Sequence, residues 1–238
     1  MDYLLDPVAG SPSRGKTASG VVFLHVEDLF MSGDAEFHRR VCASLRKDFQ
    51  VGSEDINDIQ FVGQRIKWMS STKKNGTKSE GKHVSDHIKV DQKLCLDELS
   101  EIVFDKSLKE DVSLTPSMHT EYRSVLGQLN WLQSRTQFHI AYSFSRCASA
   151  AATPTIGDVK AINKTVRTVK AMPVALHFWP LKGTLRIIGY PDASYRNNAD
   201  KSSQRGQVLF LAEERKLNSV DGKGSLIDYE SQKINRTT

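Results

Sequence analysis

Two adjacent carboxylates, Glu27 and Asp28, are the residues in this sequence best suited to chemistry. They interrupt an apolar run, residues 21–33, which is rich in β-prone side chains and ends at Ser32-Gly33, and this predicts a buried hairpin. Ionised side chains buried there need a partner or a metal to offset desolvation, and magnesium prefers hard oxygen ligands. The alternative interpretation places both acids in solvent at a loop. The apolar flanks favour the hairpin and a Mg²⁺ site.

A second pattern, at residues 10–17, matches the phosphate-binding loop Gly-x-x-x-x-Gly-Lys-Thr and would place Lys16 and Thr17 at a nucleotide. That mechanism needs a strand before the loop and a helix directly after it, so that the helix N-terminus faces the phosphates. Here Ala18-Ser19-Gly20 leads into a β-branched run instead. A nucleotide hydrolase is therefore only the third candidate function.

The composition is that of a globular protein, with 39% hydrophobic side chains and a formal net charge of +5 in 238 residues. This positive balance permits a polyanionic partner. No apolar span is long enough for a membrane helix, and the acidic start differs from the basic start of a signal peptide. We therefore expect an intracellular protein, cytoplasmic or nuclear, with no membrane partner. The three cysteines lack the spacing of a zinc or disulfide site.

Periodicity and turn signals predict the elements that position these residues. Asp34 is expected to cap a helix with an apolar face that packs on a sheet, formed by Phe37, Val41, Leu45 and Phe49. Residues 58–68 alternate loosely and predict one strand, followed by a polar, lysine-rich loop. Three further helices and three further strands are predicted: helices over 91–103, 120–152 with a break near Ser134-Arg135-Thr136, and 156–171; strands over 184–190, 206–211 and 225–229.

Several segments resemble, in the same order along the chain, the polymerase region of copia-type retrotransposons. The hairpin resembles the reverse-transcriptase pattern Tyr-x-Asp-Asp, with His25, Val26, Glu27 and Asp28 in the four positions. The remaining matches are Phe61 to Ile66 with Phe-Leu-Gly-x-x-Ile, Tyr122 to Leu132 with Tyr-Arg-Ser-x-x-Gly-x-Leu-x-Tyr-Leu, Thr136 to Ile140 with Thr-Arg-Pro-Asp-Ile, and Gly189 to Ser194 with the end of the first RNase H strand.

The resemblance implies an α+β fold with five parts. These are a poorly ordered lead-in (1–20), a partial polymerase palm with a β-hairpin, a helix and a strand (21–70), a polar loop (71–86), a thumb-like or connection helical region (87–180), and the first antiparallel strands of a truncated RNase H-like domain (184–238). Three strands cannot bury a complete core by themselves. We therefore expect this last part to be marginally stable or to lean on the preceding helices.

The resemblance also implies a set of site residues and partners. Glu27, Asp28 and Asp192 are the expected catalytic Mg²⁺ ligands, and the expected partners are an RNA/DNA template-primer duplex and the remainder of the Pol polyprotein. The expected nucleic-acid-binding residues are His25, Arg65, Arg123, Arg167 and Lys170. A core histidine and solvated helix faces are the alternative explanations of these side chains.

The implied function is that of a fragment of an RNA-directed DNA polymerase that is inactive as an isolated chain. Polymerisation in the family needs a third carboxylate, from a strand upstream of the hairpin, and RNase H chemistry needs more acids than Asp192. The extra methylene of Glu27 displaces its ligand oxygens by ~1 Å, enough in a positioned site to cost about a hundredfold in rate. The rival function is a non-catalytic nucleic-acid-binding remnant, which the basic balance permits and Glu27 favours.

Overall fold

The computed structural model describes residues 19–70, 86–196, 198, 201–214 and 224–234. The chain divides into two compact units, residues 1–62 and 63–238. Most of the predicted lead-in, the Lys16-Thr17 pattern and nearly all of the predicted polar loop lie outside the described residues. The described part holds five α-helices and three antiparallel sheets, which confirms a mixed, α+β organisation. No helix in the described ranges is long and apolar enough to cross a membrane.

The first unit begins with the predicted hairpin, formed by β1 (Gly20–His25) and β2 (Asp28–Gly33). Helix α1 (Ala35–Asp48) follows, and its cap is the predicted one, because Asp34 Oδ1 accepts a hydrogen bond from the Phe37 N–H at 2.8 Å. Phe37 is buried against the end of the hairpin, where a Cβ on Gly20 would lie 2.4 Å from its ring. Glycine at position 20 is therefore what lets the helix pack on the strands. The described chain after the Lys16-Thr17 pattern begins with strand β1, whereas a phosphate-binding loop requires a helix there, and this disfavours the nucleotide hydrolase.

The single strand predicted over residues 58–68 is wrong, because the chain forms a hairpin there. Strands β3 (Asp58–Phe61) and β4 (Gln64–Met69) are joined by Val62 and Gly63, which both have positive φ, 48° and 66°. Two such residues in succession match the tight turn that suits the twist of paired strands. The division between the two units falls in this turn. The sheet has the order β3-β4-β5-β6, with β5 at His87–Asp91 and β6 at Leu176–Phe178.

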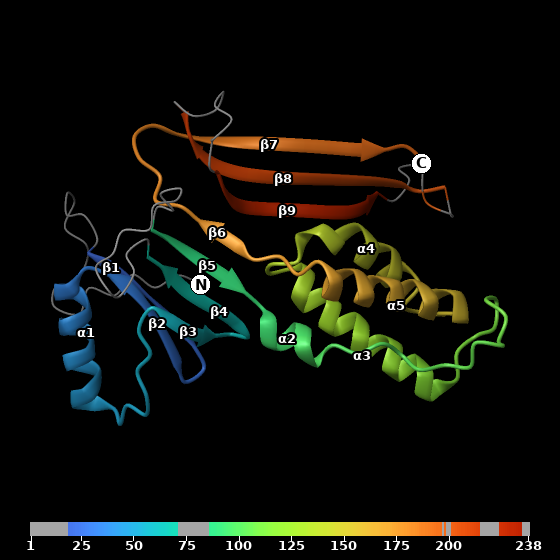
Figure 1. The fold of residues 1–238 in the computed structure, drawn as a ribbon, viewed down its shortest axis with the longest axis horizontal. Helices are drawn as coiled ribbons and strands as arrows, with labels where there is room; N and C mark the ends of the chain where they lie inside the picture. Colours follow the sequence, from blue (N-terminus) through green and yellow to red (C-terminus); the bar gives the residue numbers. More distant parts are fainter. Residues whose placement is uncertain (1–18, 71–85, 197, 199–200, 215–223, 235–238) are drawn as a thin grey trace, which may run out of the picture. The chain divides into compact units, whose positions relative to one another are not determined.

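The second unit has a helical core that follows the predicted pattern closely, except at its start. The predicted helix over 91–103 is only one short helix, α2 (Lys93–Glu98), after which residues from Leu99 onward are extended. Helix α3 (Pro116–Gln133) ends at the predicted break and is followed by a short 3₁₀ turn and α4 (Ala141–Ser149). Helix α5 (Ile156–Ala171) has the predicted bounds. Helices α3, α4 and α5 pack against one another (Figure 1). The α3 side chains predicted to share one face, Val125, Leu129 and Leu132, are buried in the core of this unit.

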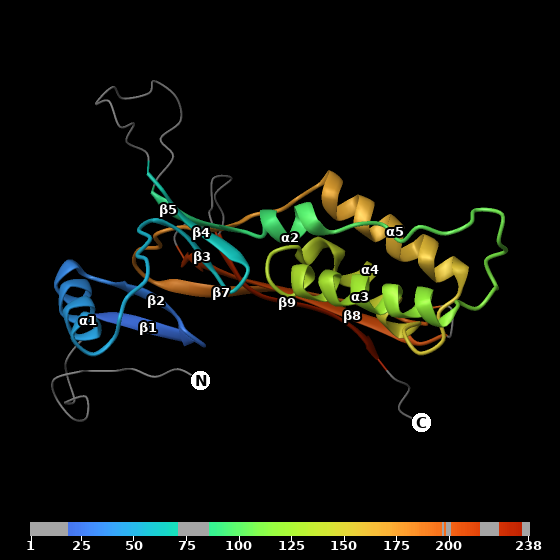
Figure 2. The same cartoon turned by 90° about the horizontal axis from the view of Figure 1, so that it is seen from below.

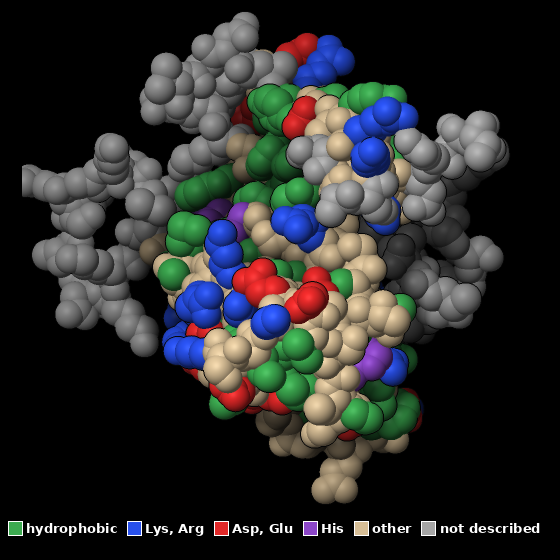
Figure 3. Space-filling view, turned by 90° about the vertical axis from the view of Figure 1, so that its right-hand side faces the viewer, with side chains coloured by type: hydrophobic (Ala, Val, Ile, Leu, Met, Phe, Trp, Pro, Cys, Tyr) green, Lys and Arg blue, Asp and Glu red, His purple; other side chains and the backbone are tan. Residues whose placement is uncertain are grey.

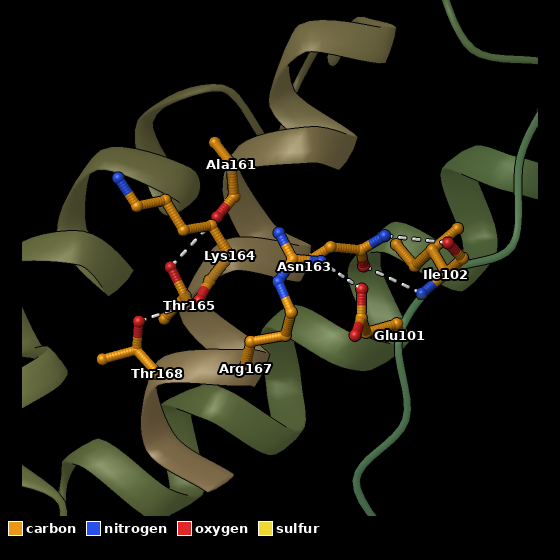
Figure 4. A network of polar contacts seen from close by, with 8 residues as sticks. All are labelled: Glu101, Ile102, Ala161, Asn163, Lys164, Thr165, Arg167 and Thr168. Atoms are coloured by element: carbon orange, nitrogen blue, oxygen red, sulfur yellow. Dashed lines mark hydrogen bonds and ion pairs between the residues drawn. The ribbon is translucent and has the colours of Figure 1, made fainter. Parts of the chain in front are cut away.

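An extended segment, Leu99 to Phe104, is held against α5 by side chains of that helix (Figure 4). The buried amide of Asn163 makes two hydrogen bonds to the backbone of Ile102. Its Oδ1 accepts from the Ile102 N–H at 2.9 Å, and its Nδ2 donates to the Ile102 carbonyl at 2.8 Å. Because buried backbone groups need partners, this one side chain allows an irregular segment to lie in the core.

The last part of the chain is a three-stranded antiparallel sheet in the order β7-β8-β9, formed by Leu185–Ser194, Ser203–Glu213 and Gly224–Ile234. These strands are longer than predicted. The sheet contacts the helical core, since the Tyr229 hydroxyl donates to the Gln133 carbonyl and Gln204 Nε2 donates to Ser145 Oγ at 3.3 Å. The Phe138 and Tyr229 rings also lie 5.7 Å apart. Strand β9 runs alongside α4 (Figure 2). The expectation that this sheet leans on the preceding helices is confirmed.

One half-buried histidine, whose ring nitrogens are buried, predicts how the stability of the second unit responds to pH. Neither ring nitrogen of His139 has a hydrogen-bond partner among the described residues, and burial lowers the pKa of its imidazole. The unfolded chain therefore binds more protons there than the folded chain does, so stability should fall as the pH drops below about 6.5. We expect urea midpoints to decrease between about pH 7.5 and 5.5, and His139→Phe to flatten this dependence. A variant with an unchanged pH profile would contradict this role of His139.

Candidate functional site

The candidate catalytic residues lie at the tip of the first hairpin. His25 pairs with Asp28 in the strand register, and Val26 and Glu27 form the two-residue turn between them. Val26 has φ of +55°, a conformation that is rare for a β-branched residue and costs on the order of 1–3 kcal/mol. Backbone outliers of this kind concentrate at functional sites. The strained turn therefore lies within the same four residues as the sequence pattern, and Val62 in the next hairpin has a similar φ of 48°.

The predicted burial of the two carboxylates is wrong, because Glu27 and Asp28 are both exposed. The apolar residues around them are exposed as well: Leu24 by 71% and Val26 by 79%. The apolar sequence of this hairpin is typical of strands that are buried by other elements. However, no described strand of this unit packs over the tip of the hairpin. His25 is exposed too, with its ring edge-on to Phe61 at 6.3 Å, so the alternative of a core histidine is also wrong.

The donor set at the tip fits magnesium as a partial site. Glu27 and Asp28 provide carboxylate oxygens from adjacent positions, and Mg²⁺ in proteins commonly takes one or two carboxylates and completes its shell with water or phosphate oxygens. No group of three acid, histidine or cysteine side chains suited to a metal occurs in the described ranges. The tip can thus supply two ligands of a shared ion.

Asp192, the third expected ligand, lies in the second unit, on β7 opposite Gly206 of β8. Its side chain is exposed, and its Oδ1 accepts a hydrogen bond from the Ala193 N–H at 2.9 Å. Within the described part of this unit, no second acid joins it in a metal-binding group. Asp192 is therefore a single exposed acid, placed on its predicted strand.

The expected nucleic-acid-binding residues do not form one surface. Arg123 is exposed on α3, whereas Arg167 and Lys170 lie on α5 and hold the extended segment: Arg167 forms an ion pair with Glu101, and Lys170 Nζ donates to the Leu99 carbonyl at 2.6 Å. On the face of the molecule drawn in Figure 3, Lys and Arg side chains lie among Asp and Glu side chains. The α5 pair thus has structural partners within the chain.

Arg65 belongs to a more basic surface that the sequence alone did not reveal. In the antiparallel register, Lys67 of β4 lies opposite Lys89 of β5, and Lys89 lies opposite His177 of β6. Directly paired residues project from the same face of a sheet, so these three side chains form one row, named here the cationic row. Arg65 is on the same face, two residues before Lys67.

Like charges placed directly opposite each other destabilise a sheet unless they have a counter-charge. One such charge is present, because Lys89 Nζ lies 3.0 Å from Asp91 Oδ2. Asp91 in turn lies opposite Arg65 in the register. The face thus carries cations from three strands together with this acid. Basic residues at alternate positions of β4, Arg65 and Lys67, were the available signal, but only the register joins residues more than a hundred positions apart.

The end of the row is bounded by an aromatic cluster. The buried ring of His87 lies 4.1 Å from the Trp179 ring and 5.0 Å from the His177 ring. Burial is the main cause that lowers the pKa of His177, followed by the charges of His87 and Lys89. The row thus combines two permanent cations with a titratable group.

Comparisons with protein-family models, with curated proteins and with solved structures found no match for this chain. The class that the fold itself defines is a mixed α+β protein with antiparallel sheets.

Proposed function

We propose that this chain is a segment of a copia-type reverse transcriptase that holds an RNA/DNA duplex and does not extend a primer on its own. The observation that carries the proposal is the cationic row with Arg65, on a sheet face made from strands far apart in sequence. A regularly spaced set of cations suits the phosphates of a nucleic-acid backbone, which need positioning charges and not base contacts. The copia-type family in this proposal rests on the sequence matches that occur in the same order along the chain.

The hairpin supports the polymerase part of the proposal. Its tip joins a strained turn to two adjacent carboxylates, the arrangement in which a polymerase presents metal ligands. When bound, magnesium would supply activation of a primer hydroxyl and stabilisation of a triphosphate. Glu27 and Asp28 would hold it, and their exposure leaves room for ligands from outside the chain.

A non-catalytic nucleic-acid-binding remnant is the second candidate, and one observation favours it. The tip provides two ligands for a metal, and one of these is the longer glutamate where the family has aspartate. Duplex binding without Mg²⁺-dependent primer extension is expected of the isolated chain under both candidates. Primer extension by an intact frame that carries Glu27, compared with its Glu27→Asp form, separates them.

Duplex binding by this chain should depend on salt through the row. Each phosphate neutralised adds about −0.9 to the slope of log K against log salt, so Lys67, Lys89 and Arg65 predict a slope of roughly −2 to −3. Removing one charge, as in Lys67→Gln or Lys89→Gln, should make the slope shallower by about 1. Fluorescence anisotropy with a labelled RNA/DNA duplex measures this.

The matched control is Lys93→Gln, which removes an exposed lysine of α2 that is paired with Asp97 and lies outside the row. Its salt slope should equal that of the parent chain. A salt slope near zero for the parent chain would contradict the proposed interface. An equal change of slope in Lys67→Gln, Lys89→Gln and Lys93→Gln would contradict it as well.

A further inference from the structure

Strand β7 (Leu185–Ser194) forms one edge of its three-stranded sheet, and no described strand pairs with its outer side (Figure 1). The strand is 10 residues long and almost fully exposed, with Ile187 at 66% and Tyr190 at 62%. The sheet contacts the helical core through residues of β8 and β9, further from this edge. An exposed edge presents unpaired N–H and C=O groups, which bind a further strand unless charges, prolines or bulges prevent it.

One contact just beyond the strand shows which backbone groups of β7 point outward. The Glu214 N–H donates to the Thr184 carbonyl at 2.9 Å, and these two residues continue the β7–β8 register. Because bonded and non-bonded pairs alternate in an antiparallel ladder, the even-numbered residues of β7 bond to β8 and the odd-numbered residues point their backbone groups outward. None of these outward residues is charged. Two features agree with this direction: Pro191 has no N–H, and the Ala193 N–H donates to Asp192 Oδ1 at 2.9 Å.

The sequence of β7 is complementary to itself when two copies pair antiparallel about Gly189. In that register Arg186 lies opposite the partner's Asp192, and Ile188 lies opposite the partner's Tyr190. Two-fold symmetry repeats both pairs on the other side of Gly189. The outward, odd-numbered residues form the bonded pairs, so Arg186 and the partner's Asp192 form a non-bonded pair, in which side chains lie closest. Opposite charges and pairs of an aromatic with a β-branched residue both stabilise neighbouring strands.

Both charged residues already make a contact within the chain, and strand pairing adds to it. The Arg186 guanidinium donates to Glu214 Oε1 through Nε at 2.9 Å and through Nη2 at 2.5 Å, while Asp192 accepts through Oδ1. A guanidinium has five N–H donors and a carboxylate has two oxygens, so each group can bind a second partner. The ion pair between Arg186 and Glu214 is therefore kept when the strands associate.

We propose that two copies of this chain associate through β7, antiparallel about Gly189, so that their sheets join into one. The occupant of the open edge is a second copy because its own strand supplies the complementary charge at both positions. This interaction surface goes beyond the proposed function and does not rest on it.

One proline limits the strength of this pair. Pro191 accepts from the partner's Ile187 N–H but has no N–H to donate in return. A short edge contact also buries less than the about 1,200–2,000 Å² of a standard interface, so the dimer is weak and forms at high concentration. A register centred on Ile187 would avoid this loss but place Arg186 opposite the partner's Ile188. The two charge pairs therefore select the register about Gly189.

Sedimentation equilibrium of the full chain over roughly 5 to 500 μM should show a reversible monomer–dimer equilibrium. The buffer holds about 50 mM salt, which screens exposed charges little, and no divalent cations, because Asp192 is also an expected metal ligand. Hydrogen exchange locates the contact. The outward amides of Ile187 and Gly189 should become protected as the concentration rises, whereas the amide of Arg186, which bonds to β8, is protected throughout.

Charge reversal tests the register. Arg186→Asp leaves acids at both positions and Asp192→Arg leaves arginines at both, so each variant repels its own copies. Each should raise the dissociation constant of the dimer about tenfold or more. An equimolar mixture of the two variants should form a heterodimer with about the affinity of the parent chain, because every acid then faces an arginine. A loss of folding in either variant would not produce this rescue.

Arg123→Asp, the same charge change at an exposed position of α3, is the matched control and should leave the equilibrium unchanged. A chain that stays monomeric over the whole range overturns the proposal, and so does a dimer in which the outward β7 amides stay unprotected. A dimer that both reversals leave intact, or a mixture that shows no rescue, overturns the register about Gly189. Duplex binding is measured separately by anisotropy, so either result stands without the other.

Discussion

Replacing Asn163 with aspartate is expected to lower the free energy of unfolding by about 3 kcal/mol or more. The Asn163 amide both accepts from and donates to the backbone of Ile102, a residue that is 2% exposed. Aspartate retains the accepting oxygen but presents a second oxygen to the Ile102 carbonyl. The substitution therefore loses one buried hydrogen bond, opposes two acceptors and buries a charge, and each of these effects is unfavourable.

Urea denaturation measures the loss, and Asn130→Asp is the matched control. Asn130 is exposed on α3, so its change should stay within about 0.5 kcal/mol. Hydrogen exchange at the Ile102 amide gives a local measurement, since this N–H donates to Asn163. Equal stability losses at positions 163 and 130 would show that the extended segment does not depend on the Asn163 amide.

The helices of the second unit could be predicted from the sequence because their signals are local. Helix α5 begins with a capping box, in which Thr155 and Asp158 bond reciprocally, and it ends before Pro173. Residues next to each end of the helix therefore determine both of its bounds. The break after α3 also lies where polar residues interrupt the apolar period. Both bounds of α5 and the end of α3 were therefore predicted within a residue or two, whereas α3 begins at Pro116, four residues before its predicted start.

The strands were harder because their stability comes from partners far away in the chain. The turn at Val62 and Gly63 has positive φ at both positions. Valine rarely adopts positive φ, so the sequence did not predict a turn there. Strand β5 is short and was not predicted, and its last residue, Asp91, was assigned to the start of the helix predicted over 91–103. Tertiary pairing with β4 and β6 decides its conformation, and no window of sequence contains that information.

In the candidate site, too, the part formed by consecutive residues was predicted and the part formed by distant strands was not. The hairpin tip was found because its pattern occupies consecutive residues, although the burial of its acids depends on what covers the ribbon and was predicted wrongly. The cationic row was not found, because a register of three strands had to join Lys67, Lys89 and His177. Arg65 was assigned to nucleic acid through the family resemblance, and only the register places it beside other cations.

A buried glutamine, Gln137, connects the stability of the helical core to the position of β6. Its Oε1 accepts from the Val174 N–H at 2.9 Å, and its Nε2 donates to the Val174 carbonyl at 2.8 Å and to Thr136 Oγ1 at 2.7 Å. Thr136 continues the network to Gln92, at the end of β5. Val174 lies in the short stretch that leads from α5 into β6. Gln137 therefore fixes both strands that carry the outer part of the cationic row.

Gln137→Leu, which has nearly the same shape and no polar atoms, is expected to lower the free energy of unfolding by about 2–4 kcal/mol, because both Val174 groups lose their partner. We also expect duplex affinity to fall at unchanged net charge, since β6 is no longer held at its start. Gln128→Leu on the exposed face of α3 is the control and should change neither quantity. Urea denaturation and anisotropy on the same samples, at concentrations of urea where both variants are folded, separate the two effects.

If the Gln137 variant loses stability but binds duplex as the parent does, the position of His177 is not set by this network. If it loses neither, the hydrogen bonds to Val174 are replaceable by water, and the link between the core and the cationic row is absent.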